Sequence, residues 1–354
     1  MTLFQRVSCC FSVTVLFAFS DTSFAHHSTA GFFDNSTKIE IAGVVTDIQW
    51  RNPHTMFELE VEDEQGDATT WMAEAGSLSI LRAQGLSGDI LNVGDFVKIL
   101  GDKSLRNRPE TFARNMLLPS GEEVFLTLGA QAHFSSSPDI DRLTGSYDAE
   151  LVANARQSAD GIFRVWSRIG DELDFIPPIF NGNTIRSLPF TERGQEVRNS
   201  WDPSAEFILG CTDWNMPRLM GNPQPMEFVR DGDNVVIKFE EGDALRTIYI
   251  DQDIHSAAAD HSLMGYSVGY WEGNALVVET NRISESSHEM PVSEEISLVE
   301  RFEINEDGSQ LHYEIIITDP VMLTESVTKT MTWNWRPEIQ VNPYDCDEEQ
   351  SFTR

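Results

Sequence analysis

The sequence predicts an all-β, mainly antiparallel protein in which an OB-like small barrel precedes a lipocalin-like up-and-down β-barrel. Three observations lead to this prediction. Short segments with alternating apolar and polar residues recur along the 354-residue chain. Gly, Asn and Asp turns separate these segments at the spacing of β-hairpins. A Ser-, Pro- and Asp-containing stretch at 135–141 then divides the segments into two sets, which indicates two domains.

The first set of segments lies in residues 26–128 and predicts the small barrel. Its expected strands are 38–50, 54–62, 68–75, 96–100, 112–118 and 123–128. The first of these strands is expected to break at Gly43, because glycine inside a strand favours a bulge or bend. A short helix is expected at 77–84, with Ser77 as its N-cap. Short strands with one small helix are typical of the OB fold, whose interior is filled by its own side chains.

The second set lies in residues 143–354, after a linker expected at 129–142. Its most regular part is a hairpin in residues 264–280, where Gly273 and Asn274 form the tip and supply a positive φ. A helix with a Thr N-cap is expected at 189–201, and further strands at 161–166, 227–230, 235–240, 245–251, 296–304, 311–319 and 327–335. About eight antiparallel strands predict an up-and-down barrel, which can hold one small molecule.

The charge of the chain is strongly acidic. It has 57 Asp and Glu against 25 Lys and Arg, a formal net charge of -32. Such a surface repels nucleic acid phosphates and anionic lipid head groups, so we expect no nucleic acid partner and no peripheral membrane binding. The simpler interpretation of this acidity is that it keeps the protein soluble in a salty habitat. The more specific interpretation is that the surface attracts cations.

The first 25 residues have the pattern of a secretory signal. Arg6 precedes an apolar stretch at 7–19 that is too short to span a bilayer, and Ser23-Phe24-Ala25 is a small-x-Ala cleavage site. No later stretch approaches the length of a membrane-spanning helix. We therefore expect a periplasmic or secreted protein without membrane insertion after cleavage.

Two cysteines remain after the expected cleavage, because Cys9 and Cys10 lie in the removed segment. In an exported protein, Cys211 and Cys346 indicate a single disulfide that ties the C-terminal tail to the start of the second domain. The alternative is two buried free thiols.

The N-terminal part resembles a known family. The motifs are H-H-S near the mature start, G-V-V-x-x-I-x-W-x-N-P-H at 43–54 and L-x-x-G-D-x-V-K-I-x-G at 91–101. Together they resemble the uncharacterised DUF6152 family of exported bacterial proteins over about residues 24–128. This resemblance implies no activity.

The C-terminal part resembles uncharacterised exported bacterial proteins through G-x-S-x-G-x-W-E-G-x-x-L-V-V-x-T, Glu300–Phe302, Asp319-Pro320 and Tyr344–Cys346. Many of those proteins have His at the position of Tyr266 in this chain. This departure weakens any chemistry that the resemblance implies.

The mature N-terminus is a candidate copper site. After cleavage behind Ala25, His26 offers its amine and imidazole, and His27 offers a second imidazole. His54 is a third candidate ligand, with Asp34 as an outer-shell carboxylate. Copper(II) favours such a nitrogen-rich, planar set. The alternative is that two polar histidines merely follow a cleavage site.

Candidate catalytic residues are spread over the second domain. They are Glu272, Glu300, Asp319, His255 and His261. The two histidines belong to an acidic loop at 251–261, for which an exposed loop at the barrel mouth is the simpler interpretation. A glutamate that points into an apolar barrel has a raised pKa and can act as a general acid or base. The chain contains no P-loop or dinucleotide fingerprint, and G-Y-S-V-G at 265–269 lies in a strand pattern rather than before a helix.

Aromatic residues are numerous in the expected strands of the second domain. Those expected to line a ligand pocket are Tyr249, Tyr266, Tyr270, Trp271 and Trp333. Aromatic walls with a few polar groups suit an apolar ligand, although aromatics also serve as ordinary core. The leading hypothesis is therefore binding of a small, mostly apolar molecule in the second barrel. The alternatives are a cofactor-free isomerase, cyclase or lyase that uses carboxylates in that barrel, and a copper-binding protein.

Overall fold

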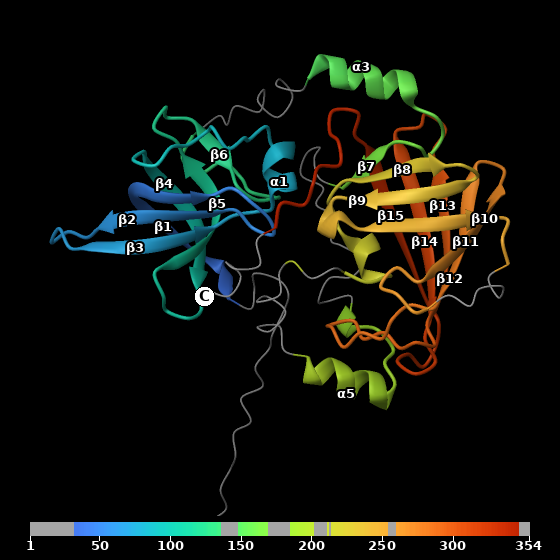
Figure 1. Cartoon of the computed structure of the whole chain (residues 1–354). Coiled ribbons are helices and arrows are strands. Elements are labelled where there is room, and N and C mark those ends of the chain that lie inside the picture. Colours follow the sequence, from blue (N-terminus) through green and yellow to red (C-terminus); the bar gives the residue numbers. More distant parts are fainter. Residues whose placement is uncertain are drawn as a thin grey trace, which may run out of the picture.

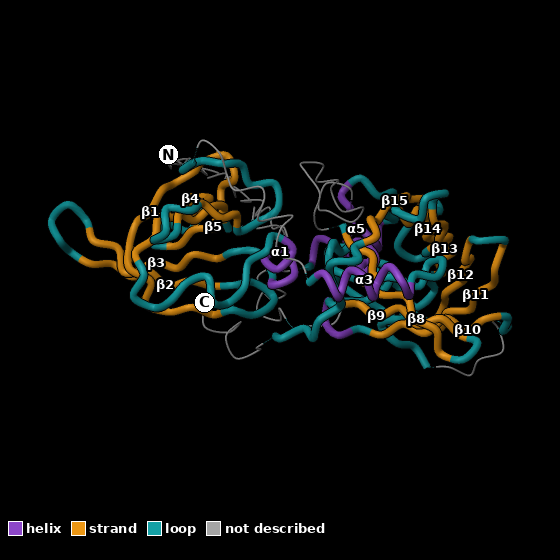
Figure 2. Tube along the Cα trace, turned by 90° about the horizontal axis from the view of Figure 1, so that it is seen from above, coloured by secondary structure: helices purple, strands orange, loops and turns teal. Residues whose placement is uncertain are grey.

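A computed structural model describes residues 32–135, 148–168, 185–201, 211, 214–253 and 260–346. It confirms an all-β, mainly antiparallel fold with two units (Figure 1). The first unit is a six-stranded sheet and the second is a closed barrel. Figure 2 shows the two units side by side, with α1 of the first unit on the side that faces the barrel.

The first unit has the strand arrangement expected for an OB-like barrel. Its elements are β1 (Phe33–Gln49), β2 (Met56–Glu62), β3 (Ala68–Glu74), α1 (Leu78–Ala83), β4 (Phe96–Ser104), β5 (Glu110–Leu117) and β6 (Glu123–Phe125). The sheet order is β3-β2-β1-β4-β5-β6, and an additional parallel pairing of β3 with β5 closes the first five strands into a ring. The predicted N-cap of α1 is confirmed, because the Ser77 side chain accepts a hydrogen bond from the Ile80 amide.

Strand β1 is continuous at Gly43, where the sequence predicts a break. The irregularity of its pairing with β2 lies between Val45 and Asp47 instead. Gly43 is needed for another reason. A Cβ at this position would lie 2.4 Å from the carbonyl oxygen of Glu60, so only glycine lets the two backbones approach this closely.

The first unit extends to Ser135, within the stretch expected to be a linker. The buried carboxylate of Glu123 accepts backbone hydrogen bonds from His133, Phe134 and Ser135, at 2.7, 3.0 and 2.9 Å. It also accepts one from the Asn115 side chain. Burial opposes ionisation of Glu123, but the bonds from His133, Phe134 and Ser135 outweigh it and lower its pKa.

The second unit is a closed barrel of nine strands. They are β7 (Val165–Ser167), β8 (Met226–Asp231), β9 (Asn234–Phe239), β10 (Leu245–Ile250), β11 (Tyr266–Glu272), β12 (Ala275–Asn281), β13 (Ser297–Ile304), β14 (Gln310–Thr318) and β15 (Val327–Trp335). The predicted tip of the β11–β12 hairpin is confirmed. Glu272 pairs with Ala275, and Gly273 has a φ of 66°, whereas Asn274 does not have a positive φ.

The barrel departs from a simple up-and-down arrangement at one place. A closed ring in which every neighbour runs antiparallel needs an even number of strands, so an odd ring contains a parallel pair. That pair is β10 and β11, with Ile248 opposite Ser267 and Ile250 opposite Gly269. Strands β10 and β11 therefore begin at the same end of the barrel.

Large side chains occupy the barrel interior. Trp166, Phe228, Phe302, Tyr313 and Trp333 are each almost fully buried. The rings of Phe228 and Phe302 lie 5.3 Å apart, those of Phe302 and Tyr313 4.9 Å, and those of Tyr313 and Trp333 5.1 Å. This part of the barrel is a packed core rather than an open cup.

Among the described residues, four short helical segments accompany the barrel. They are α3 (Ala149–Ser158), α5 (Glu192–Ser200), η2 (Arg218–Gly221) and η3 (Glu241–Asp243). Thr191 caps α5 as predicted, by accepting from the Gly194 amide. Helix α3 was not predicted, and it buries none of its residues. Among the described segments, no helix has the length and apolar character needed to cross a membrane.

The C-terminal tail, residues 336–346, passes between the two units (Figure 1). In the first unit, the Asn52 amide donates to the carbonyl of Asp345 at 2.8 Å, and Asn52 forms a parallel bridge with Cys346. Cys346 is joined to Cys211 by the predicted disulfide, with Cα atoms 5.8 Å apart. The tail therefore holds both units together.

Candidate functional site

The structure places the five predicted pocket aromatics in different environments. Trp333 is buried inside the barrel, whereas Tyr249, Tyr270 and Trp271 are 38 to 40% exposed. Tyr266 is half-buried and stacks on Tyr249, with ring centroids 5.2 Å apart. Successive strand residues face opposite sides, and the buried Ile248 takes the inner side next to Tyr249. The expectation that all five rings line the interior is therefore corrected.

Two predicted catalytic carboxylates have structural partners. Glu272 is exposed and pairs with Arg301 at 2.8 Å. Asp319 is buried and accepts hydrogen bonds from Ser293 N and Oγ and from the amides of Val321 and Met322, at 2.7 to 3.1 Å. Its oxygens hold the β14–β15 connection in place.

The predicted loop histidines do not form a described site. His261 is exposed, and His255 lies outside the described residues. In the described part of the loop, Asp251, Asp253 and Asp260 are also exposed.

Glu300 is the centre of a polar network inside the barrel. Arg246 Nη1 donates to Glu300 Oε1 at 3.0 Å, and its Nη2 pairs with Oε2. Tyr313 donates to Oε1 at 2.8 Å, and Arg246 also donates to Ser267 and Thr280. Burial opposes the charge of Arg246, yet Glu300 raises its pKa. Because both charges are buried and paired, this network is suited to holding β10, β11, β12, β13 and β14 together rather than to binding a ligand.

The predicted copper ligands are only partly described. His26 and His27 lie outside the described residues. His54 pairs through Nδ1 with Oε1 of the buried Glu74, an arrangement that fixes a histidine ring. Asp34 is exposed and accepts hydrogen bonds from Ser36 and Thr37, which lower its pKa to about 2.

Within the described residues, no group of three or more His, Cys, Asp and Glu side chains is placed to hold a metal ion. The three-histidine copper site depends on residues beyond that part, so it stays a prediction.

A small recess opens at the mouth of the barrel, near the junction of the two units. We call it the junction recess. Its walls are Leu219, Met220, Asn222, Gln224, Pro225, Met226, Phe239, Glu241 and Trp333. Its empty space is about 210 Å³, part of it open solvent, and the enclosed part accommodates about one water molecule. Within the part of the chain that the structure describes, three polar atoms in these walls are buried without a hydrogen-bond partner: Glu241 Oε2, Asn222 Nδ2 and Gln224 Oε1.

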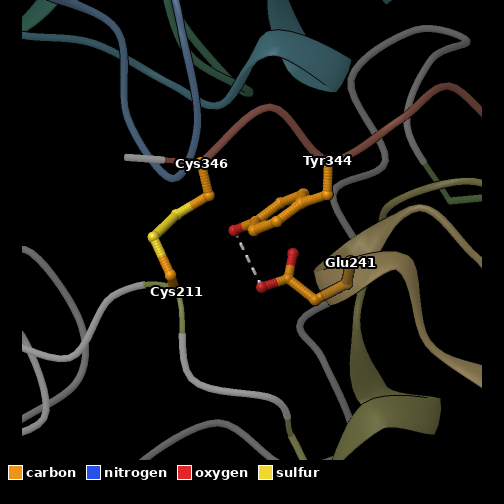
Figure 3. Close-up of a disulfide and its surroundings, with 4 residues drawn as sticks. All are labelled: Cys211, Glu241, Tyr344 and Cys346. Carbon is orange, nitrogen blue, oxygen red and sulfur yellow. Dashed lines mark hydrogen bonds between the residues drawn. A yellow bond between two sulfur atoms is a disulfide. The ribbon is translucent and has the colours of Figure 1, made fainter. Parts of the chain in front are cut away.

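Glu241 is the charged residue of the junction recess. It follows β9 in the short turn η3 and is 7% exposed. The Tyr344 hydroxyl donates to its Oε1 at 3.0 Å, as Figure 3 shows, while Oε2 has no partner. Burial raises the pKa of Glu241 to about 7, and the bond from Tyr344 opposes this rise. Near neutral pH the carboxyl can therefore give or take a proton.

The C-terminal tail brings the partners of this turn. The amide of Asn342 donates to Glu240 Oε2 at 3.1 Å, and that of Tyr344 donates to Asp243 at 3.0 Å. Glu240 is fully buried, and burial raises its pKa as well. Arg82 of α1 approaches Glu240 Oε1 to 3.7 Å. The turn is thus buried by the first unit and the tail together.

Glu241 was not predicted as a site residue, because its E-E-G-D segment has the pattern of an ordinary hairpin turn. Its burial depends on Tyr344, 103 positions along the chain. The one available signal was the Y-x-C pattern that ends in Cys346.

The fold and the junction recess define a two-unit β protein with a recess at a barrel mouth. The model of a family of unknown function, DUF6152, matches residues 15–110. This match supports the resemblance predicted for the N-terminal part. The matched range does not include any residue that lines the junction recess. No curated protein matches the chain.

Proposed function

We propose that this protein is exported and binds a small, mostly apolar molecule at the junction recess of its second barrel. The observation that carries the proposal is the combination of apolar walls with three unpaired buried polar atoms. Buried polar atoms without a protein partner mark positions where a water molecule or a polar group of a ligand can bind.

The walls have the composition of a ligand site. Six of the lining residues are apolar: Leu219, Met220, Pro225, Met226, Phe239 and Trp333. Small-molecule sites combine predominantly apolar walls with a few polar groups that fix orientation. Methionines adapt their shape to a guest, because their side chains are unbranched and flexible. The limited volume restricts the enclosed part of the ligand to a few atoms.

Export is supported by the disulfide between Cys211 and Cys346. Disulfides persist in oxidising compartments such as the periplasm and the extracellular space. The expected signal segment, residues 1–25, lies outside the described residues. N-terminal sequencing of the mature protein tests this part of the proposal, and a chain that still begins at Met1 would contradict it.

The binding proposal is tested with four-carbon probes and methionine methyl NMR. The probes are n-butanol, butyramide, n-butylamine and butyrate. Binding at the junction recess shifts the methyl signals of Met220 and Met226, which line it. Met56 and Met116 lie in the first unit and serve as internal controls. No shift with any probe, or equal shifts at all four methionines, would overturn the proposal.

A second candidate function is a cofactor-free isomerase, cyclase or lyase. It is favoured by Glu241, whose pKa of about 7 suits a general acid or base at neutral pH. In such a reaction Oε2 takes a proton from a carbon next to a carbonyl group and returns it to the same molecule. Exchange of the α-protons of cyclohexanone in D₂O measures the first step. Equal rates for wild type and Glu241→Gln would rule out this role.

A further inference from the structure

We infer that the ligand of the junction recess is a small alkyl amine, whose ammonium group pairs with Glu241 Oε2. This inference rests on the proposed binding function and adds the chemical class of the head group. It starts from the only ionisable side chain among the described residues of the recess walls.

The unpaired acceptors of the junction recess match an ammonium group. Glu241 Oε2 and Gln224 Oε1 are both buried and both lack a donor. An ammonium group has donors only, whereas a carboxylate head group would bring further acceptors. The third unpaired atom, Asn222 Nδ2, is itself a donor and does not bind the ammonium group.

The size of the enclosed space fits the same group. It accommodates about one water molecule, and an ammonium group is of similar size. The alkyl chain then extends toward the open side, along the apolar walls. Trp333 and Phe239 line the recess, and aromatic rings attract a nearby cation through their faces.

The charged groups around Glu241 do not fully compensate for the burial of its carboxyl. The groups that act on its carboxyl are Tyr344 from the tail, Arg218 from η2, His54 from the first unit and the adjacent Glu240. Arg218 lies over the Trp214 ring at 3.8 Å. The positive groups favour ionisation of Glu241, but burial outweighs them. A bound ammonium supplies the missing counter-charge, and the net charge of -32 attracts cations to the protein.

Amine binding is expected to depend on pH, because it uses the ionised form of Glu241. The apparent affinity should fall about tenfold for each pH unit below 7, where protonation of the carboxyl competes with the amine. Binding of n-butanol should not follow this dependence, because a neutral hydroxyl needs no ionised carboxyl.

The test is isothermal titration of the full mature chain with n-butylamine, n-butanol and butyrate at pH 6, 7 and 8. The three probes share the same apolar chain and differ in head group. We expect n-butylamine to bind at least tenfold more tightly than n-butanol at pH 8, and butyrate not to bind. Glu241→Gln should abolish this preference, while Glu272→Gln, at an exposed acid of the same barrel, should keep it.

The outcomes separate the two proposals. If n-butanol or butyrate binds as tightly as the amine, the amine inference fails and the binding function stands. If no probe binds, both fail. If Glu241→Gln does not fold, Gln224→Leu removes the second acceptor and should weaken amine binding several-fold relative to n-butanol. An unchanged ratio in that variant, with no pH dependence in wild type, would overturn the inference.

Discussion

Two buried glutamates of the same barrel differ in how completely they are paired. Glu300 is fully buried, and its two oxygens receive Arg246 and Tyr313. Glu241 is 7% exposed, and only one of its oxygens has a partner, Tyr344. Glu300 faces an enclosed core, whereas Glu241 faces a recess that opens to solvent.

The difference separates a structural carboxylate from one available for binding. A buried charge with matching partners is satisfied within the fold and gains nothing from a ligand. A buried carboxyl with a free oxygen remains costly until a donor arrives.

The largest effect is expected at the paired site. Glu300→Gln leaves the charge of the buried Arg246 without its counter-ion, so unfolding free energy should fall by about 3–5 kcal/mol. Urea denaturation measures the loss. The double variant Arg246→Met with Glu300→Leu removes both charges and should recover most of it. A single-variant loss below about 1 kcal/mol would show that the pair is not needed.

The disulfide ranks second. Cys211 and Cys346 are 135 positions apart, so their bond restricts a long loop in the unfolded chain. Cys346→Ser should lower the unfolding free energy by about 2–4 kcal/mol. It should also raise the exposure of Tyr344, which fluorescence quenching can follow. Equal denaturation midpoints for the variant and wild type would contradict this prediction.

The pH dependence of stability comes third. The pKa of Glu241 is raised from an ordinary 4.5 to about 7 in the folded chain, so its neutral form stabilises the fold. This contribution is fully present below pH 4.5 and is lost as pH rises to about 7. It amounts to about 3 kcal/mol, at 1.36 kcal/mol for each unit of pKa difference. The difference in stability between wild type and Glu241→Gln isolates it, and a difference that is constant from pH 4.5 to 8 would refute it.

A smaller effect is expected at Tyr344. Tyr344→Phe removes the hydrogen bond to Glu241 and should cost about 1 kcal/mol. Because that bond lowers the pKa of Glu241, the pH transition of stability should move to higher pH. Denaturation at several pH values tests both effects. A shift to lower pH would contradict the assigned direction.

The smallest effect is expected at the exposed pair of Glu272 and Arg301. Surface ion pairs contribute little, so Glu272→Gln should leave the unfolding transition unchanged. A clear loss of stability would mean that this ion pair contributes more to the unfolding free energy than an exposed pair is expected to.

Local features of the fold could be predicted from the sequence, because nearby residues determine them. Gly273 marks the β11–β12 turn, and Ser77 and Thr191 cap their helices as expected. The disulfide followed from the presence of two cysteines in a chain expected to be exported.

Features that depend on closure of the barrel could not be predicted. The partners Arg246 and Glu300 meet only because β10 and β13 belong to one ring. The parallel pairing of β10 with β11 exists because the ring has an odd number of strands. That number is hard to count from the sequence, because a strand as short as β7 has no clear pattern. Tyr249 and Tyr270 are exposed, although tyrosine also occurs in protein cores. The alternation of apolar residues alone therefore led to the wrong expectation that they line the barrel interior.

The candidate site was the least predictable part. Glu241 becomes buried when the C-terminal tail and the first unit cover its turn, which no local pattern reports.

A carbon-13 NMR titration of the Glu241 carboxyl, with and without n-butylamine, tests most directly whether this carboxyl is free to bind an amine. We expect a midpoint near pH 7 in the free protein, from the burial of a half-paired carboxyl. Saturating n-butylamine should move this midpoint to lower pH, because the ammonium favours the ionised form. A midpoint near 4.5 that the amine leaves unchanged would contradict both the raised pKa and the binding of an amine at Glu241.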